Sequence, residues 1–361
     1  MFCHTFAQLI KTIIIILSVI IVFDNTSNAA DAWIKKTIEL TINTSFDEAL
    51  QTVREQIEKD SCDYRAWFYL AATYNSQMTH FENEADADAF DQAIDKAIDL
   101  INNELEDEER LEDSTQARLF FYLGSAYGYR AYLQGSTGQF LAAVSNGLKS
   151  IGYLNDALEK DSTLYGAYLG IGVYKYWRYS RLGFISWLPV IPDDREEGIA
   201  MINVAIANDS LSKYMAMHQL IYILLDYGNS ADALKFAQKV VRKYPQSQFM
   251  WWANAHAYFK HGDFEQAEIS YRNLFRLISA DKNKNITHLL KCQYKRAQIA
   301  KYLDDYMQCI DYCNMILGFK NYPDLNNSAE DVLSEAKELR AECFKLTASN
   351  SEEVKRKTDG L

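Results

Sequence analysis

The most informative part of the sequence is residues 251–274, which read WWANAHAYFKHGDFEQAEISYRNL. Bulky, small and aromatic residues recur at helical spacing before Gly262, and similar residues recur after it. Because glycine readily ends a helix and permits a tight turn, we expect one helix on each side of Gly262. The residues that set this pattern are Trp251, Ala255, Tyr258, Gly262, Phe264, Ala267, Tyr271 and Leu274.

The same pattern recurs on both sides of this stretch, over residues 217–317. The preceding copy lies 34 residues earlier, and the following copy is delayed by extra length that we place in polar residues 281–285. A repeat of this period indicates stacked helix pairs, each with an apolar face that only its neighbour covers. The flanking copies are marked by Met217, Ile221, Leu224, Gly228, Ala233, Ala237 and Val240, and by Ala297, Ala300, Asp304, Tyr306, Cys309, Cys313 and Ile316.

In spacing, side-chain size and turn residues together, these copies resemble the tetratricopeptide repeat, and the resemblance extends over residues 30–346. It implies an all-α fold, a right-handed α-α superhelix (a TPR solenoid) of about six helix pairs with a C-terminal capping helix. The copies in residues 30–216 are divergent, and three of them carry about 10–14 extra residues between the first and second helix. We expect longer helices or projecting loops there.

A second resemblance covers residues 165–177, 183–192 and 193–198. This segment is similar to a repeat subgroup related to a eukaryotic outer-mitochondrial-membrane and inclusion-clearance family. Bacterial relatives of that subgroup are exported proteins of unassigned role, so the likeness concerns the fold more than the function.

The C-terminal region is predicted to seal the repeat stack. Residues 328–346 form an amphipathic helical pattern, with Ser328 and Asp331 as a capping box at its start. Such a helix would cover the last exposed apolar face, as terminal elements of solenoids must. Residues 347–361 are polar and aperiodic, and we expect a flexible tail.

Residues 1–29 have the features of a secretory signal peptide, with Lys11, an apolar run over residues 12–23, and Ser27 and Ala29 at its end. The run is shorter than the roughly 20 residues that a bilayer-spanning helix needs. We therefore expect an exported protein of the periplasm or cell envelope, or a secreted one, with no integral membrane span in the mature chain. The remaining cysteines are odd in number and scattered, so they form no disulfide framework, although export permits one or two bridges.

Composition and motifs argue against nucleic-acid binding and against catalysis. The formal net charge is -12, whereas nucleic acids favour basic patches. The sequence has no HExxH, CxxC or three-glycine dinucleotide motif, so we expect no enzymatic activity, no metal and no cofactor. Cys309 and Cys313 suggest a thiolate metal site with His288, but they align with Ala267 and Tyr271, which favours core packing.

In repeats of this class the first helices line a concave groove, and the corresponding positions here are largely aromatic. Tyrosine and tryptophan are typical of protein contact sites, although packing between adjacent helices accounts for about half of such residues. The Lys and Asn pair with which chaperone-type repeats hold a C-terminal carboxylate is not supported here. The projected groove residues are Phe68, Phe121, Tyr129, Tyr176, His218, Tyr222, Trp252, His256, Lys260, Tyr294, Gln298 and Tyr302.

The apolar loop at residues 183–192 is either tucked into the repeat stack or exposed to a partner. Its candidate contact residues are Phe184, Trp187, Leu188 and Pro189.

Three functions follow from this sequence. The leading hypothesis is a scaffold or adaptor that binds a protein or peptide, in association with an envelope complex. The alternative is a solenoid that binds a small molecule, glycan or lipid in the same groove. An enzyme with its site in the insertions is disfavoured, because clustered histidines and acid pairs are absent from the sequence.

Overall fold

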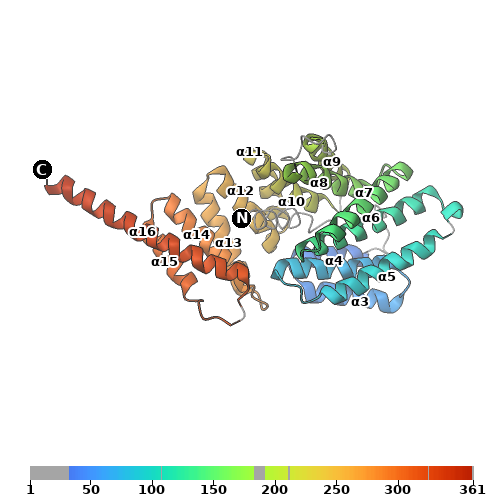
Figure 1. The fold of residues 1–361 in the computed structure, drawn as a ribbon, viewed down its shortest axis with the longest axis horizontal. Coiled ribbons are helices and arrows are strands. Elements are labelled where there is room, and N and C mark those ends of the chain that lie inside the picture. Colours follow the sequence, from blue (N-terminus) through green and yellow to red (C-terminus); the bar gives the residue numbers. More distant parts are fainter. Residues whose placement is uncertain (1–31, 107, 183–191, 210–211, 324, 360–361) are drawn as a thin grey trace. The chain divides into compact units, whose positions relative to one another are not determined.

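A computed structural model of the chain describes residues 32–106, 108–182, 192–209, 212–323 and 325–359. In these ranges all regular elements are helices, fifteen α-helices and one 3-10 turn, so the predicted all-α class is confirmed (Figure 1). The predicted signal peptide lies outside the described residues, as do Phe184, Trp187, Leu188 and Pro189. The chain divides into two compact units, Met1–Ile223 and Leu224–Leu361.

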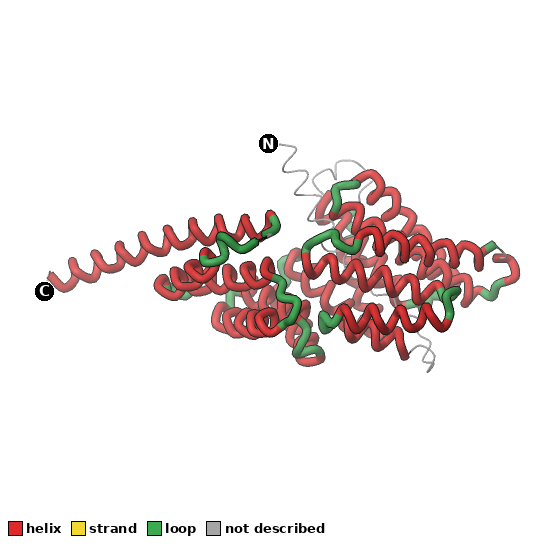
Figure 2. The backbone as a smooth tube through the Cα atoms, turned by 90° about the horizontal axis from the view of Figure 1, so that it is seen from below, coloured by secondary structure: helices red, strands yellow, loops and turns green. Residues whose placement is uncertain are grey.

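The first unit is a series of helices that run back and forth, joined by short loops (Figure 2). From α2 to α9 each helix packs on the next, most extensively in the pairs α4 with α5, α6 with α7 and α8 with α9. Helices two apart in sequence, such as α4 and α6, also contact each other, which is the packing of a repeat stack. The helices are α2 (Ala32–Ile42), α3 (Phe46–Lys59), α4 (Tyr64–Phe81), α5 (Ala87–Leu105), the 3-10 turn η2 (Glu108–Arg110), α6 (Asp113–Ser136), α7 (Phe140–Lys160), α8 (Tyr165–Leu182), α9 (Arg195–Asn208) and α10 (Lys213–Asp226), which continues past the unit boundary.

The extra residues predicted in this unit lengthen its helices. Helices α4, α5, α6 and α7 have 18, 19, 24 and 21 residues. In the regular repeats, α11 (Ser230–Lys243) and α12 (Gln248–His261) have 14 each, and α13 (Phe264–Ala280) and α14 (Ile286–Tyr302) have 17 each. Longer helices bury more side chains against one another, and the aromatic rings of Phe68, Tyr122 and Tyr129 are enclosed between α4 and α6.

The second unit contains the regular repeats. Its helices are α11 (Ser230–Lys243), α12 (Gln248–His261), α13 (Phe264–Ala280), α14 (Ile286–Tyr302), α15 (Tyr306–Leu317) and α16 (Asn327–Asp359). Each helix from α11 to α15 begins with a polar side chain that accepts a hydrogen bond from a backbone N–H of the first turn, which satisfies a donor that the helix leaves unpaired. These capping residues are Asn229, Ser247, Asp263, Asn285 and Asp305.

The turns within the regular pairs have the expected backbone. Gly228 and Gly262 both adopt φ of 87°, a left-handed conformation in which a side chain would be strained. The third copy places Asp304 at the corresponding position with φ of 59°. Aspartate is one of the few other residues that tolerate this conformation, so the turn geometry is kept without glycine.

Helix α14 shows how neighbouring pairs share a core. Its Cys292 and Ile299 belong to a buried cluster with α12 and α13, whereas its Leu290 and Ala297 belong to a second cluster with α15 and α16. Two opposite stripes of one helix are therefore apolar and covered, which requires a partner on each side. This arrangement is the linear stacking that the repeat pattern predicts.

The last helix differs from prediction at both ends. It begins at Asn327, and Asn326 caps it by accepting a hydrogen bond from the Ala329 N–H at 2.9 Å, so Ser328 and Asp331 do not form its start. It also continues through the predicted tail to Asp359. The residues beyond Leu346 include no proline, and glycine occurs only at Gly360, so a helix can propagate through them.

Helices α8 and α9 cross so closely that only glycine fits at the contact. A Cβ atom on Gly172 would lie 2.6 Å from the Gly198 carbonyl oxygen, and one on Gly198 would lie 2.6 Å from the Gly172 carbonyl oxygen. We predict that Gly172→Ala lowers the free energy of unfolding by about 1–3 kcal/mol, because the two backbones must separate. The midpoint of urea denaturation, followed by circular dichroism, measures this loss.

Gly152→Ala is the matched control, because Gly152 is a helical glycine on α7 with no atom within 4 Å of its added Cβ. We expect it to raise the free energy of unfolding by about 0.5–1 kcal/mol through backbone entropy alone. Equal destabilisation by both substitutions would contradict the close crossing.

Candidate binding surface

Four of the projected groove residues lie in the core of the first unit. Phe68, Phe121 and Tyr176 are 0% exposed and Tyr129 is 2% exposed. Their rings contact other buried aromatic side chains, as Phe68 does with Tyr129 at 5.7 Å between centroids. No ligand can reach these side chains in the folded chain, so their role is packing and the groove projection does not hold for them.

His218 and Tyr222 lie on α10, with their ring centroids 5.2 Å apart. His218 is 8% exposed, and Tyr222 is partly buried. Burial raises the pKa of the Tyr222 hydroxyl, which therefore stays protonated at neutral pH.

The other six projected residues lie on α12 and α14 of the second unit, where ring contacts join the two helices. The rings of Trp252 and His288 are 5.6 Å apart, and those of Phe259 and Tyr302 are 5.8 Å apart. Tyr302 also stacks on Phe264 at 4.6 Å with its ring nearly parallel. Because Tyr302 remains 59% exposed, this stack offers one open aromatic face to a ligand.

Lys295 is part of the same surface, although it is not among the projected groove residues. Its ammonium group lies 5.0 Å from the centre of the Phe259 ring and donates a hydrogen bond to Gln298 Oε1 at 2.9 Å. Burial lowers the pKa of Lys295, against the opposing effect of Glu335 on α16. A partly desolvated ammonium beside aromatic rings attracts an anionic group more strongly than a fully hydrated one does.

The register along α14 explains why Lys295 replaces Tyr294. His288, Lys291, Lys295, Gln298 and Tyr302 recur at spacings of three and four, which aligns them on one face of the helix. Tyr294 lies off this stripe and packs, partly buried, against the cluster that α14 shares with α15 and α16. Burial, followed by the charge of Glu335, raises its pKa to about 12. The helical spacing of the polar residues on α14 was the signal that could have found this stripe.

His256 on α12 lies close to two positive charges. Burial lowers the pKa of His256 to about 4, and the charges of Lys260 and Lys295 act in the same direction. The imidazole is therefore neutral at neutral pH, and the field around it is positive. We name the set Trp252, His256, Lys260, Lys295, Gln298 and Tyr302 the α12–α14 surface.

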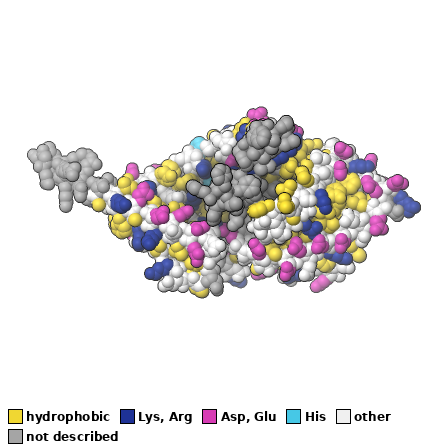
Figure 3. Space-filling view, in the orientation of Figure 1, with side chains coloured by type: hydrophobic (Ala, Val, Ile, Leu, Met, Phe, Trp, Pro, Cys, Tyr) yellow, Lys and Arg dark blue, Asp and Glu magenta, His cyan; other side chains and the backbone are white. Residues whose placement is uncertain are grey.

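A second exposed feature lies in the first unit, where hydrophobic side chains gather over α6 and α7 (Figure 3). Leu141, Val144 and Leu148 are 90%, 62% and 60% exposed, and their spacing places them on one stripe of α7. The α12–α14 surface combines aromatic rings with cationic and amide groups that can orient a ligand, so it is the better candidate for specific recognition.

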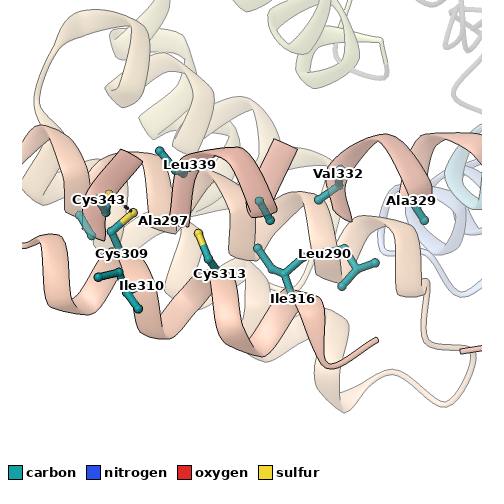
Figure 4. Close-up of a cluster of buried hydrophobic side chains, with 12 residues drawn as sticks. Leu290, Ala297, Cys309, Ile310, Cys313, Ile316, Ala329, Val332, Leu339 and Cys343 are labelled. Carbon is teal, nitrogen blue, oxygen red and sulfur yellow. Dashed lines mark hydrogen bonds between the residues drawn. The ribbon is translucent and has the colours of Figure 1, made fainter. Parts of the chain in front are cut away.

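Metal binding at the cysteines finds no support in the described part of the chain. Within it, no group of three His, Cys, Asp or Glu side chains could hold a metal ion. Cys309 and Cys313 are 0% exposed and lie in the apolar cluster of α14, α15 and α16 (Figure 4). Among the helices described, none is long and apolar enough to cross a bilayer.

Comparisons with known proteins place the fold. The sequence matches no protein-family model and no curated protein. Among solved structures, the chain is similar to the crystal structure of the APC/C hetero-tetramer Cut9-Hcn1, with 13% identity, a TM-score of 0.50, and coverage of 87% of this chain and 57% of that chain. The protein thus spans little more than half the length of that chain, and the likeness concerns the fold alone.

Two further matches carry the repeat in their description. One is the C-terminal part of a TPR repeat-containing protein from Cytophaga hutchinsonii, with 15% identity, a TM-score of 0.43, and coverage of 82% of this chain and 98% of that chain. The other is the TPR domain of P58(IPK), with 12% identity, a TM-score of 0.27, and coverage of 87% of this chain and 99% of that chain.

The described residues therefore form an all-α helical-repeat fold of sequential antiparallel helix pairs, similar to the fold of the chain in the Cut9-Hcn1 crystal structure. Its likeness to the outer-mitochondrial-membrane subgroup stays a prediction, because none of these comparisons tests it.

We expect the stability of the folded chain to depend on pH through the partly buried His256. Its pKa of about 4 in the folded chain lies below the ordinary value of about 6.5 that applies to the unfolded chain. The unfolded chain therefore binds the proton first, and stability present above pH 6.5 is lost progressively as the pH falls toward 4. The free energy of unfolding in urea is measured at pH 7 and at pH 4.5. We predict that its decrease between these two pH values is smaller in His256→Gln, by on the order of 2 kcal/mol.

His261→Gln on the same helix is the control. His261 is exposed, and its Nδ1 pairs with Ser230 Oγ at 3.0 Å. This substitution should leave the difference between the two pH values unchanged. A pH dependence that is the same for His256→Gln and for the unsubstituted chain would show that His256 is not held neutral.

Proposed function

We propose that the protein is an exported, non-catalytic scaffold that binds a segment of another polypeptide on its α12–α14 surface. The observation that carries the proposal is the exposed ring of Tyr302, which contacts Phe259, together with the ammonium of Lys295 over the same Phe259 ring. Lys260 lies close enough to Lys295 to lower its pKa. Aromatic and cationic groups on rigid helices give contact area and charge recognition at small entropic cost, as in the centres of protein interfaces.

The charges of this surface favour an acidic segment. Lys260 and Lys295 both act to lower the pKa of His256, so their fields overlap at that point. The chain as a whole carries a formal net charge of -12, which makes this positive region an exception. Glu335 on α16 offsets part of the charge of Lys295. We therefore propose a partner segment that combines an Asp or Glu side chain with an aromatic or aliphatic one.

Export rests on the sequence of residues 1–29, with its apolar run and small terminal residues. An exported repeat scaffold of this kind would act in the periplasm or cell envelope, as a member of an envelope assembly.

Selection of binding peptides tests the proposal. Panning a phage-displayed random peptide library on the full chain should enrich sequences with Asp or Glu beside an aromatic or aliphatic residue. In fluorescence anisotropy, Lys260→Ala and Tyr302→Ala should each weaken binding of the selected peptides about tenfold, because each removes one exposed side chain from the α12–α14 surface. Binding should also weaken as the salt concentration rises.

Lys282→Ala and Tyr322→Ala are the matched controls, because both side chains are exposed and lie outside the α12–α14 surface. They should leave the affinity unchanged. Enrichment of basic peptides, or affinities that Lys260→Ala and Tyr302→Ala do not change, would refute the proposed surface. Mass spectrometry of the purified chain tests the alternative of a small-ligand solenoid. A bound glycan or lipid that neither peptide nor salt displaces would favour that alternative.

A further inference from the structure

Two cysteine side chains meet at the contact between α15 and α16. Cys309 Sγ on α15 and Cys343 Sγ on α16 are 2.9 Å apart, and both residues are 0% exposed. Figure 4 shows the two sulfur atoms facing each other, with Cys313 one turn further along α15. Non-bonded sulfur atoms ordinarily stay farther apart, and a covalent S–S bond is about 2.05 Å long, so a small side-chain rotation would bring them to bonding distance.

The surroundings of this pair indicate neither a metal site nor another polar role. The cluster around it is apolar and includes Ile310, Ala336 and Leu339, and no metal-binding group of side chains occurs in the described residues. Cys292 of α14 is engaged elsewhere, since its thiol donates to the Tyr271 carbonyl oxygen at 3.2 Å. Cys313 also hydrogen-bonds Cys309, but these two residues lie one turn apart on the same helix, α15. Cys309 and Cys343 are therefore the pair whose sulfur atoms meet across the contact between α15 and α16.

We propose that Cys309 and Cys343 form a disulfide bond that fastens α16 to α15. Helix α16 covers the last apolar face of the repeat stack with Ala329, Val332 and Leu339, and it is held there by packing against α14 and α15. A bond between residues 309 and 343 closes a loop of more than thirty residues, which restricts the unfolded chain and opposes undocking of the capping helix.

The reaction needs a two-electron oxidant, and a small-molecule disulfide such as glutathione disulfide supplies it. The thiolate of one cysteine attacks a sulfur of the oxidant, which breaks the S–S bond, forms a mixed disulfide and releases one glutathione thiolate. The thiolate of the second cysteine attacks the protein sulfur of the mixed disulfide and displaces the second glutathione. Two protein thiols are oxidised, the oxidant is reduced to two thiols, and the two thiol protons pass to the departing glutathione.

Burial determines when this reaction occurs. Both sulfur atoms are enclosed once α16 has docked, so an oxidant reaches them only while α16 is open or still folding. Burial also raises the pKa of Cys343 to about 12, which keeps its thiol protonated and unreactive in the docked state. The bond should therefore form rapidly when oxidant is present during refolding, and slowly when it is added to the folded, reduced chain.

Peptide mapping tests the proposal directly. The full chain is refolded in a glutathione redox buffer, alkylated under denaturing conditions without reduction, digested and analysed by mass spectrometry. We expect a cross-linked peptide pair that contains Cys309 and Cys343, lighter by two hydrogen atoms than the two free peptides. Cys313 should carry the alkyl group, and Cys313→Ala should leave the cross-link unchanged.

Stability provides the second measurement. The oxidised chain should unfold at a higher urea concentration than the same chain reduced with dithiothreitol, and α16 should show slower amide exchange. In Cys343→Ala, oxidation should change neither the urea stability nor the amide exchange of α16. If that variant does not fold, the unsubstituted chain, oxidised against reduced, still gives both comparisons. Alkylation of both Cys309 and Cys343 after oxidative refolding, or a bridge that uses Cys313 in place of either, would overturn the proposal.

Discussion

The structure depends on how closely its helices can approach. At the crossings of the second unit the chain places alanine residues with no exposed surface, such as Ala237, Ala255, Ala267 and Ala297. A small side chain at a crossing lets two backbones come together, and the large side chains beside it then fill the space between them. Each helix pair gains its stability from this fit, but leaves one apolar face that only the next pair covers.

This constraint also determines where a ligand can bind. The faces that pack between helix pairs are buried in the core, and two stripes of α14 belong to such buried clusters. Its remaining stripe carries Lys295, Gln298 and Tyr302, which belong to neither cluster. Lys295 and Tyr302 both contact the ring of Phe259 on α12. The proposed binding would therefore use the side chains that packing leaves exposed, and the helices of the unit would support them rigidly.

The sequence predicted those features that spacing determines. Gly228 and Gly262 mark the turns because left-handed backbone favours glycine, and the small positions mark the crossings. The sequence placed Tyr294 on the surface where Lys295 belongs, since a spacing pattern leaves the rotation of a helix uncertain by one residue, or about 100°. It also counted Phe68 and Phe121 among the surface residues, because the burial caused by the longer helices of the first unit depends on contacts distant in sequence.

The helix pairs of the second unit stabilise one another as nearest neighbours. Native-state amide hydrogen exchange of the reduced chain at increasing, sub-denaturing urea concentrations measures the opening free energy of each helix. We expect α15 and α16, at the end of the stack, to open at lower urea than α13 and α14, which are covered on both sides. A single opening free energy for all helices from α12 to α16, or opening of α13 before α15, would contradict it.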